Sequence, residues 1–177
     1  MTTFKFLMNG ARGPFSGFAW PSPRGSAPGE WVEVDGPLAL CVRGVHVCRA
    51  VDLAHWLHDE LWEVETAGER IEGLDCLIVR RARLLRRISS WTDGGAMRFS
   101  QACIEHAATL AGTTADDTVS RYLEDAKHAA NAGYVAVSAH AAALAVAKLG
   151  PAAENESVFR RERVWQASWI TRELIAS

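Results

Sequence analysis

Several motifs that mark common activities are missing from this sequence. The P-loop, the dinucleotide-binding G-x-G-x-x-G, the zinc-protease H-E-x-x-H and the hydrolase G-x-S-x-G do not occur in its 177 residues. The chain has no Cys-x2-Cys pair of the kind that builds the strongest zinc patterns. No internal repeat of roughly 20–50 residues stands out, so the sequence does not predict a solenoid or a propeller.

Long apolar runs and strong net charge are lacking too. The longest apolar runs are Ala-rich and far shorter than the roughly 20 residues of a membrane span. A net charge of −2 and a pI of about 6.3 imply no general attraction to nucleic acid or to anionic membranes. The opening MTTFKFLMNG has no signal-peptide pattern. We therefore expect a cytoplasmic protein without a membrane partner and with reduced cysteines, although a Cys41–Cys48 disulfide stays open.

The two halves of the chain differ in amino-acid composition. Residues 1–90 hold five of the six prolines and most glycines, with short β-like runs between them, whereas residues 95–177 are Ala-rich and contain only Pro151. Such segregation predicts an α+β fold. We expect a small, twisted, mainly antiparallel sheet in a domain of residues 1–90, and about four helices in residues 91–177 that pack on it.

Local patterns in the first half predict strands and two short helices. Alternating or β-rich runs predict strands at residues 3–8, 31–34, 45–48 and 60–67. Asp52 is a good N-cap for a short helix that ends at His58. Leu74–Arg80 predicts a further short helix, and Ala82–Ile88 a strand.

The second half predicts helices near residues 96–111, 116–132, 135–149 and 157–175, separated by glycines that suit helix C-termini. Apolar residues of the last helix recur at helical spacing and predict a buried stripe. They are Val158, Val164, Trp165, Trp169, Ile170 and Leu174. This stripe suits docking on the sheet or a homodimer through the helical half, and the sequence leaves both open.

The stretch from Cys41 to Cys48 is the densest group of reactive side chains. Strand alternation puts His46 and Cys48 on one face. Cys41, His46 and Cys48 supply three zinc ligands at most, whereas closed zinc sites need four. Cys48 beside Arg49 also has the positive neighbour that a nucleophilic thiolate requires. The alternative is a purely structural strand, in which Cys48 packs as a small apolar residue and His46 forms a local hydrogen bond.

A basic run lies between Arg80 and Arg87, with five arginines in eight residues. Guanidinium groups at this density suit phosphates. Acidic residues between Glu63 and Asp75 can neutralise the run, so we expect no nucleic-acid partner.

The first half resembles an uncharacterised domain family of phage and bacterial proteins. The likeness rests on Gly17-Phe-Ala-Trp20, Trp31-Val-Glu33, a C-x-x-G-x-H-x-C core from Cys41 to Cys48, and Leu61-Trp-Glu-Val-Glu65. It continues through Leu84–Arg87. Some members resemble the chain along its whole length. This resemblance implies kinship and no particular activity.

A second, weaker resemblance is to ADP-ribosyltransferases. Gly44-Val-His-Val-Cys48, a helix and Leu61–Gly68 are similar to the strand–helix–strand core of those enzymes. There, a residue at the position of His46 stacks near nicotinamide. Asn9 stands where the first motif of the family has His or Arg, and no residue matches the catalytic glutamate. The resemblance implies NAD as a cofactor or substrate.

Taken together, the sequence favours a non-catalytic binding or interaction module with a small-molecule or protein partner. Its contact surface is the Trp20–Pro23 loop beside the His46 strand. The candidate ligand-binding residues are Asn9, Trp20, His46 and Trp62, and the candidate metal ligands are Cys41, His46 and Cys48. An NAD-binding enzyme that holds nicotinamide with Asn9 and His46 and a zinc-stabilised structural domain are the alternatives, and no catalytic residue is identified.

Overall fold

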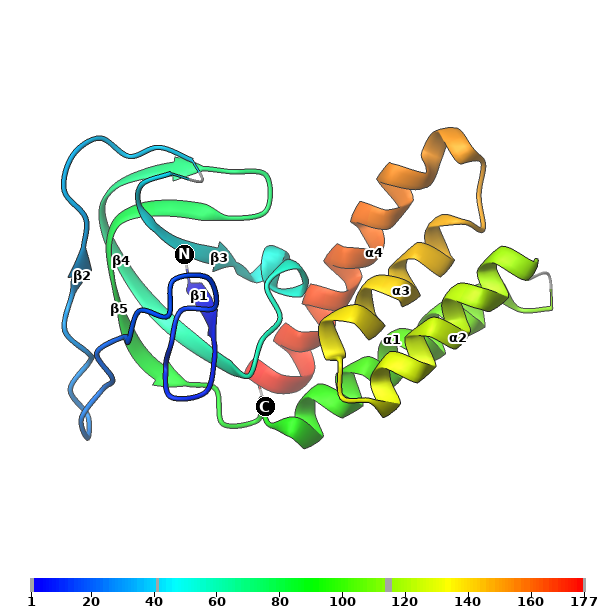
Figure 1. The fold of residues 1–177 in the computed structure, drawn as a ribbon, viewed down its shortest axis with the longest axis horizontal. Helices are drawn as coiled ribbons and strands as arrows, with labels where there is room; N and C mark the ends of the chain where they lie inside the picture. Colours follow the sequence, from blue (N-terminus) through cyan, green and yellow to red (C-terminus); the bar gives the residue numbers. More distant parts are fainter. Residues whose placement is uncertain (1, 41, 114–115, 177) are drawn as a thin grey trace. The chain divides into compact units, whose positions relative to one another are not determined.

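The computed structural model describes residues 2–40, 42–113 and 116–176. The chain divides into two compact units, Met1–Trp91 and Thr92–Ser177. The strands lie in the first unit and the long helices in the second (Figure 1), which confirms the predicted α+β class.

Unit 1 is an antiparallel sheet of five strands. They are β1 (Thr3–Leu7), β2 (Val32–Glu33), β3 (Val45–Arg49), β4 (Glu60–Glu72) and β5 (Leu77–Arg87). The order is β2-β5-β3-β1-β4, and β4 also pairs with β5, so four strands close into a ring. Register shifts in the β4–β5 pair, at Glu63/Val64 and Ala67/Arg70, bend these long strands (Figure 1) and let β4 reach both neighbours.

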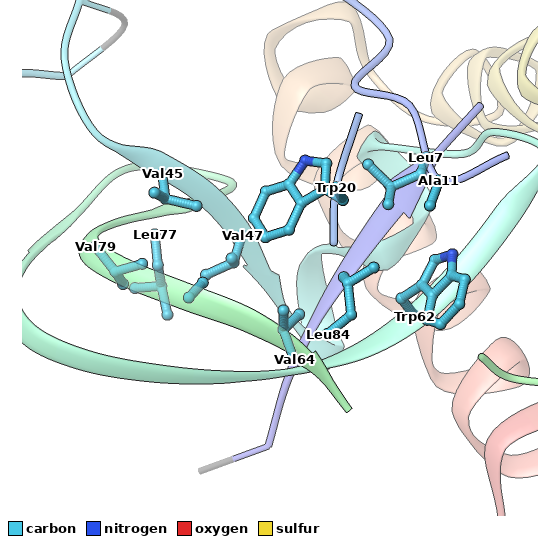
Figure 2. Packing of buried hydrophobic residues seen from close by; sticks show 11 residues of the cluster. Leu7, Ala11, Trp20, Val45, Val47, Trp62, Val64, Leu77, Val79 and Leu84 are labelled. Atoms are coloured by element: carbon cyan, nitrogen blue, oxygen red, sulfur yellow. The ribbon is translucent and has the colours of Figure 1, made fainter. Parts of the chain in front are cut away.

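The interior of the closed sheet is filled by large apolar side chains. Alternation along each strand turns every second residue inward, and Figure 2 shows these residues converging. The buried cluster is Leu7, Ala11, Trp20, Val45, Val47, Trp62, Val64, Leu77, Val79, Ala82 and Leu84. Gly44, which precedes β3, has φ +143°, and a Cβ there would collide with Ile78. The turn into β3 therefore requires glycine.

Two local predictions in unit 1 are wrong. Leu74–Arg80 contains no helix, because Leu77 to Arg87 is one continuous strand. The apolar run LIV is too short for its periodicity to separate helix from strand, and ladders to β3 and β4 decide the outcome. The expected helix from Asp52 to His58 is instead a 3-10 segment, Ala50–His55. Its N-cap is Arg49, whose backbone N–H donates to the Asp52 carboxylate at 3.3 Å.

Unit 2 contains four helices in its described part. They are α1 (Asp93–Ala111), α2 (Asp117–Asn131), α3 (Val135–Ala147) and α4 (Asn155–Ile170), and α4 runs into a π-helical turn, Thr171–Ile175. Two of these helices begin at side-chain caps. Thr92 Oγ1 accepts from Gly95 N at 3.2 Å, and Asp116 Oδ1 accepts from Val119 N at 2.8 Å.

Alanines build the core of unit 2. Helix α3 contacts α1, α2 and α4, and seven of its thirteen residues are alanine. Small side chains let helix backbones approach closely. No helix in the described part of the chain is both long and apolar enough to cross a membrane.

The apolar stripe expected on the last helix is only partly buried. Ile170 and Leu174 are buried, but Val164 is 46% exposed. The buried face of α4 also carries three polar residues, Glu162, Arg163 and Gln166. Hydropathy alone misplaces this face, because it scores buried polar residues as solvent-facing.

Candidate functional site

Unit 1 contains a cavity of about 750 Å³. It lies where β1, β2, β3, the loop after β1 and the segment before β4 meet. Aromatic and aliphatic side chains provide most of its wall. The lining residues are Lys5, Phe6, Gly13, Pro14, Phe15, Ser16, Phe18, Trp20, Val32, Glu33, Val34, Gly44, Val45, His46, Val47, Cys48, His55, Trp56, Leu57 and His58.

The cavity forms beside an incomplete ladder. Strands β1 and β3 share only the pairs Thr3↔Arg49 and Phe4↔Cys48. Beyond the second pair, the Lys5 ammonium donates to the carbonyl oxygen of His46 at 2.6 Å. The Lys5 side chain thus takes the place of a backbone N–H donor from β1. At this place, residues from both faces of β3, Val45 and Val47 on one and His46 and Cys48 on the other, line the cavity.

Lys5 is the charged group at the inner side of the cavity. It is cross-strand partner to Trp62 and shares the inner face of β1 with Leu7. Its Nζ lies 5.1 Å from the ring centroid of Trp20. Burial lowers the pKa of Lys5 to about 8, because a desolvated ammonium loses hydration.

Trp20 supplies the broadest apolar surface of the site. Its backbone N–H donates to Ala11 O at 2.9 Å, which holds the strand-like end of the loop against the segment after β1. The Phe18 ring meets it edge-on, with centroids 6.1 Å apart and planes at 87°. Such an edge contact is favourable between aromatic rings. Phe15, nearer the loop tip, is 89% exposed and still lines the cavity.

His46 lies on the opposite face of β3 from Val45 and Val47, and it also lines the cavity. Burial and the neighbouring Lys5 charge lower the pKa of His46 below its ordinary value. The imidazole is therefore neutral at pH 7 and has one nitrogen free of a proton, able to accept a hydrogen bond.

Cys48 lies on the same face of β3 as His46, but its thiol is unreactive. Its thiol donates to Phe4 O at 3.3 Å, and burial raises its pKa to about 12. A neutral, buried thiol is a poor nucleophile. Cys41 lies outside the described residues, and within those residues no three His, Cys, Asp or Glu side chains are grouped to hold a metal.

Asn9 and Trp62 do not line the cavity. Asn9 belongs to the turn after β1, where its backbone N–H donates to Asp59 Oδ2 at 3.0 Å. Trp62 is buried in the core, and its indole N–H donates to Glu60 Oε2 at 2.9 Å. The structure thus brings Trp20 and His46 to one cavity and leaves the other two candidates in the framework.

Glu60 is a positioning residue that sequence reasoning missed. This buried carboxylate accepts from the backbone N–H groups of Gly10 and Ala11 at 3.2 and 3.1 Å, and from Trp62. Arg87 pairs with it at 3.3 Å. Because the loop that begins at Gly10 carries Phe15 and Trp20, Glu60 anchors one wall of the cavity. An acidic residue at the first position of an apolar strand is the only sequence signal for it.

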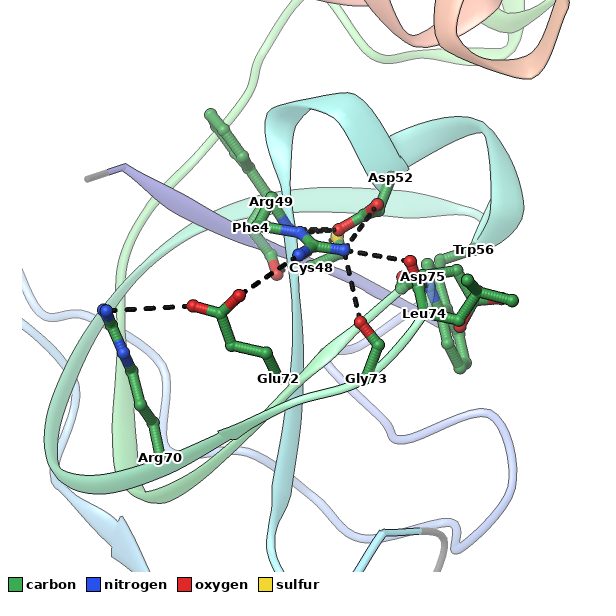
Figure 3. Close-up of polar contacts among 10 residues, drawn as sticks. All are labelled: Phe4, Cys48, Arg49, Asp52, Trp56, Arg70, Glu72, Gly73, Leu74 and Asp75. Carbon is green, nitrogen blue, oxygen red and sulfur yellow. Dashed lines mark hydrogen bonds and ion pairs between the residues drawn. The ribbon is translucent and has the colours of Figure 1, made fainter. Parts of the chain in front are cut away.

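A second set of polar contacts, around Arg49, holds the segment that carries Trp56 (Figure 3). Arg49, at the end of β3, pairs with Asp52 at 2.5 Å and donates to Leu74 O at 3.0 Å. The indole N–H of Trp56 donates to Asp75 O at 2.7 Å. These bonds tie the 3-10 segment to the β4–β5 turn and so place Trp56 against the cavity.

The arginine run of β5 is paired with carboxylates, most of them partly exposed. Arg83 faces Glu65 at 2.7 Å and Arg86 faces Glu63 at 2.6 Å, as directly opposed residues of β4 and β5. The other pairs are Arg80–Glu69, Arg81–Glu33 and Arg87–Glu60. Every arginine of the run has a carboxylate partner, as the neighbouring acids suggested.

The three histidines of unit 2 have separate surroundings. The His106 ring stacks on Trp165 with centroids 3.7 Å apart, and its Nε2 lies 3.3 Å from Glu162 Oε2. His140 meets Phe159 edge-on at 5.2 Å, whereas His128 is exposed. These contacts serve helix packing.

No family model, curated protein or solved structure matches the chain. The geometry of the cavity therefore carries the functional argument.

Proposed function

We propose that unit 1 is a binding module for a small ligand with a flat, apolar body, held in the cavity where Trp20 and His46 meet. One observation carries the proposal: two of the residues that the sequence singled out, far apart in the chain, line the same cavity of about 750 Å³. This volume falls within the roughly 300–1,000 Å³ of typical ligand pockets.

The chemistry of the wall suits such a ligand. Trp20, Phe18 and Trp56 offer ring faces and edges to an apolar body. A few polar groups among apolar ones fix a ligand's orientation, and the His46 imidazole and the Lys5 ammonium are available for this. Both walls are held by buried or half-buried bonds, from Glu60 and from Arg49, so the cavity is formed before a ligand arrives.

A screen of small aromatic compounds by saturation-transfer NMR tests the proposal, followed by titration of the hits. Phe15→Ala and His46→Ala should weaken binding several-fold without changing the fold, because Phe15 is 89% exposed and His46 lies at the cavity wall. Leu74→Ala is the matched control, since the Leu74 side chain is 74% exposed, does not line the cavity, and contributes only its backbone carbonyl to the Arg49 contacts. Hits with equal affinity for all variants, or no hits at all, would contradict the proposal.

NAD belongs in the same screen, because the resemblance to ADP-ribosyltransferases implies it. Asn9 lies off the cavity wall, so His46 would have to hold nicotinamide without it. Saturable NAD binding that is lost in His46→Ala would favour the enzyme alternative. A flat titration would leave the aromatic-ligand module as the better description.

A further inference from the structure

Lys5 is the charged group of the cavity that lacks a counter-ion. Among the described residues, no carboxylate lies within 4.0 Å of its Nζ, and the ammonium donates a hydrogen bond to the neutral carbonyl of His46. The arginines of β5, by contrast, all have carboxylate partners. A desolvated ammonium is stable only when a partner compensates for its lost hydration.

The surroundings of Lys5 do not compensate for that loss. Cys48 is a neutral thiol at pH 7, and the imidazole of His46 is neutral as well. Glu33 lines the cavity, but its carboxylate is half exposed and lies 3.9 Å from Arg81. The Trp20 ring, 5.1 Å away, offers a weak cation–π contact only.

We propose that the ligand of this cavity carries an anionic group, a carboxylate or its equivalent, which pairs with the Lys5 ammonium while the apolar body lies against Trp20 and Phe18. This inference rests on the proposed function of the cavity and specifies its ligand class. The ammonium has three donors, of which His46 O takes one. Two donors therefore remain for an anion, and the His46 imidazole can contribute a further hydrogen bond.

A matched pair of probes tests the inference. 2-Naphthoate and 2-naphthamide share a flat body and differ in charge. A charge-assisted hydrogen bond contributes roughly 1.5–3 kcal/mol, which corresponds to roughly tenfold to hundredfold in affinity. We expect the protein to bind the carboxylate at least tenfold more tightly than the amide at pH 7. Lys5→Met should abolish this preference and keep the amide's affinity, whereas Lys127→Met, on the exposed face of α2, should change neither.

The charge state of Lys5 gives an independent readout. The chain has only three lysines, Lys5, Lys127 and Lys148, so 13C-lysine spectra resolve each Cε signal, and Lys5→Met assigns the one of interest. Without ligand, Lys5 should titrate near pH 8. Bound 2-naphthoate should raise that midpoint by at least one pH unit, because the anion favours the ammonium, and 2-naphthamide should not.

The outcomes separate the two proposals. Equal affinity for both probes, or a carboxylate preference that survives in Lys5→Met, would overturn the anionic-ligand inference and leave the cavity as a site for neutral aromatic compounds. Failure of both probes to bind, with no effect on the Lys5 titration, would overturn both proposals. Lys5 can also be tested for imine formation with 2-naphthaldehyde, trapped by cyanoborohydride. Covalent labelling of Lys5 without any preference for the carboxylate probe would overturn the ion-pair inference in favour of carbonyl chemistry at Lys5.

Discussion

The two units of this protein place their charged residues differently. In unit 1, most arginines of β5 pair with partly exposed glutamates, and the interior holds large apolar side chains with a cavity beside them. In unit 2, alanines bring helices together, and Glu162, Arg163 and Gln166 are buried on α4. The architecture of each unit explains where its charged side chains lie. In the sheet, strand alternation gives most charged side chains a position that faces away from the core. In the helical unit, helix α4 buries several of its own polar residues.

The helical unit thus buries three polar side chains on one helix, whereas the carboxylates buried in the sheet unit, Asp52 and Glu60, anchor loops and turns. Gln166 is fully buried, accepts from Arg163 at 2.8 Å and donates to Ala139 O at 2.8 Å, which ties α4 to α3. Oε1 of Glu162 has no hydrogen-bond partner in the described part of the chain. Burial raises the pKa of Glu162 to about 7 and lowers that of Arg163 to about 10. The stability of unit 2 should therefore depend on the protonation state of Glu162.

The largest effect we expect is from Leu77→Ala in unit 1. Leu77 is 1% exposed in the core cluster, and losing its side chain should cost roughly 2–5 kcal/mol of unfolding free energy. Urea unfolding followed by hydrogen exchange of peptides from each unit measures where the loss occurs. Leu74→Ala, three residues earlier and exposed, is the control. A loss spread equally over both units would contradict the separate cores.

Glu162→Gln should remove a pH dependence from unit 2. The carboxyl has a pKa of about 7 when folded against an ordinary value of 4.5, so wild-type stability is greatest below pH 4.5 as far as this group is concerned. It falls as pH rises from 4.5 to 7, by roughly 3 kcal/mol in total. His106, with a lowered pKa, acts in the opposite direction but is present in both proteins. Urea unfolding at pH 5.5 and pH 8 should show a larger advantage of the variant at pH 8; an advantage independent of pH would refute the role of Glu162.

Ala142→Leu tests the close helix packing of unit 2. Ala142 is fully buried on α3, which contacts the other three helices, so extra carbon atoms should cost roughly 1–3 kcal/mol. Ala136→Leu on the exposed side of the same helix controls for helix propensity. Thermal unfolding of both variants gives the comparison. Equal melting temperatures would mean that α3 has room for larger side chains.

The smallest effect should come from the outer ion pairs of unit 1. A double-mutant cycle on Glu65 and Arg83, which face each other 2.7 Å apart on β4 and β5, should give a coupling of roughly 0.2–1 kcal/mol. The coupling should shrink at high salt, because both side chains are partly exposed. A coupling of several kcal/mol would show that outer charges stabilise unit 1 as much as its core does.

Part of the candidate site was predictable, and the rest needed long-range contacts. Trp20 and His46 stood out because a Trp-Pro segment and a Cys/His strand are unusual in composition. Lys5 and Glu60 did not, since a single charge in a strand reads as solvent-facing until its neighbours are known. Asn9 was a candidate through the resemblance to ADP-ribosyltransferases, and Trp62 lies in a stretch that both resemblances share. The hydrogen bonds of these two residues go to Asp59 and Glu60.

The sequence by itself determined the α+β class, the segregation of strands and helices, and most element positions. Alternation, helical spacing, glycines and caps are local signals, and they act within a few residues. Only the tertiary structure decided that Leu77–Arg87 is one strand, that β4 closes the sheet onto β5, and that a buried face of α4 is polar. It alone joined Lys5, Trp20 and His46 around one cavity. Strand pairing and side-chain burial depend on partners distant in the chain, and a single sequence does not reveal which partners meet.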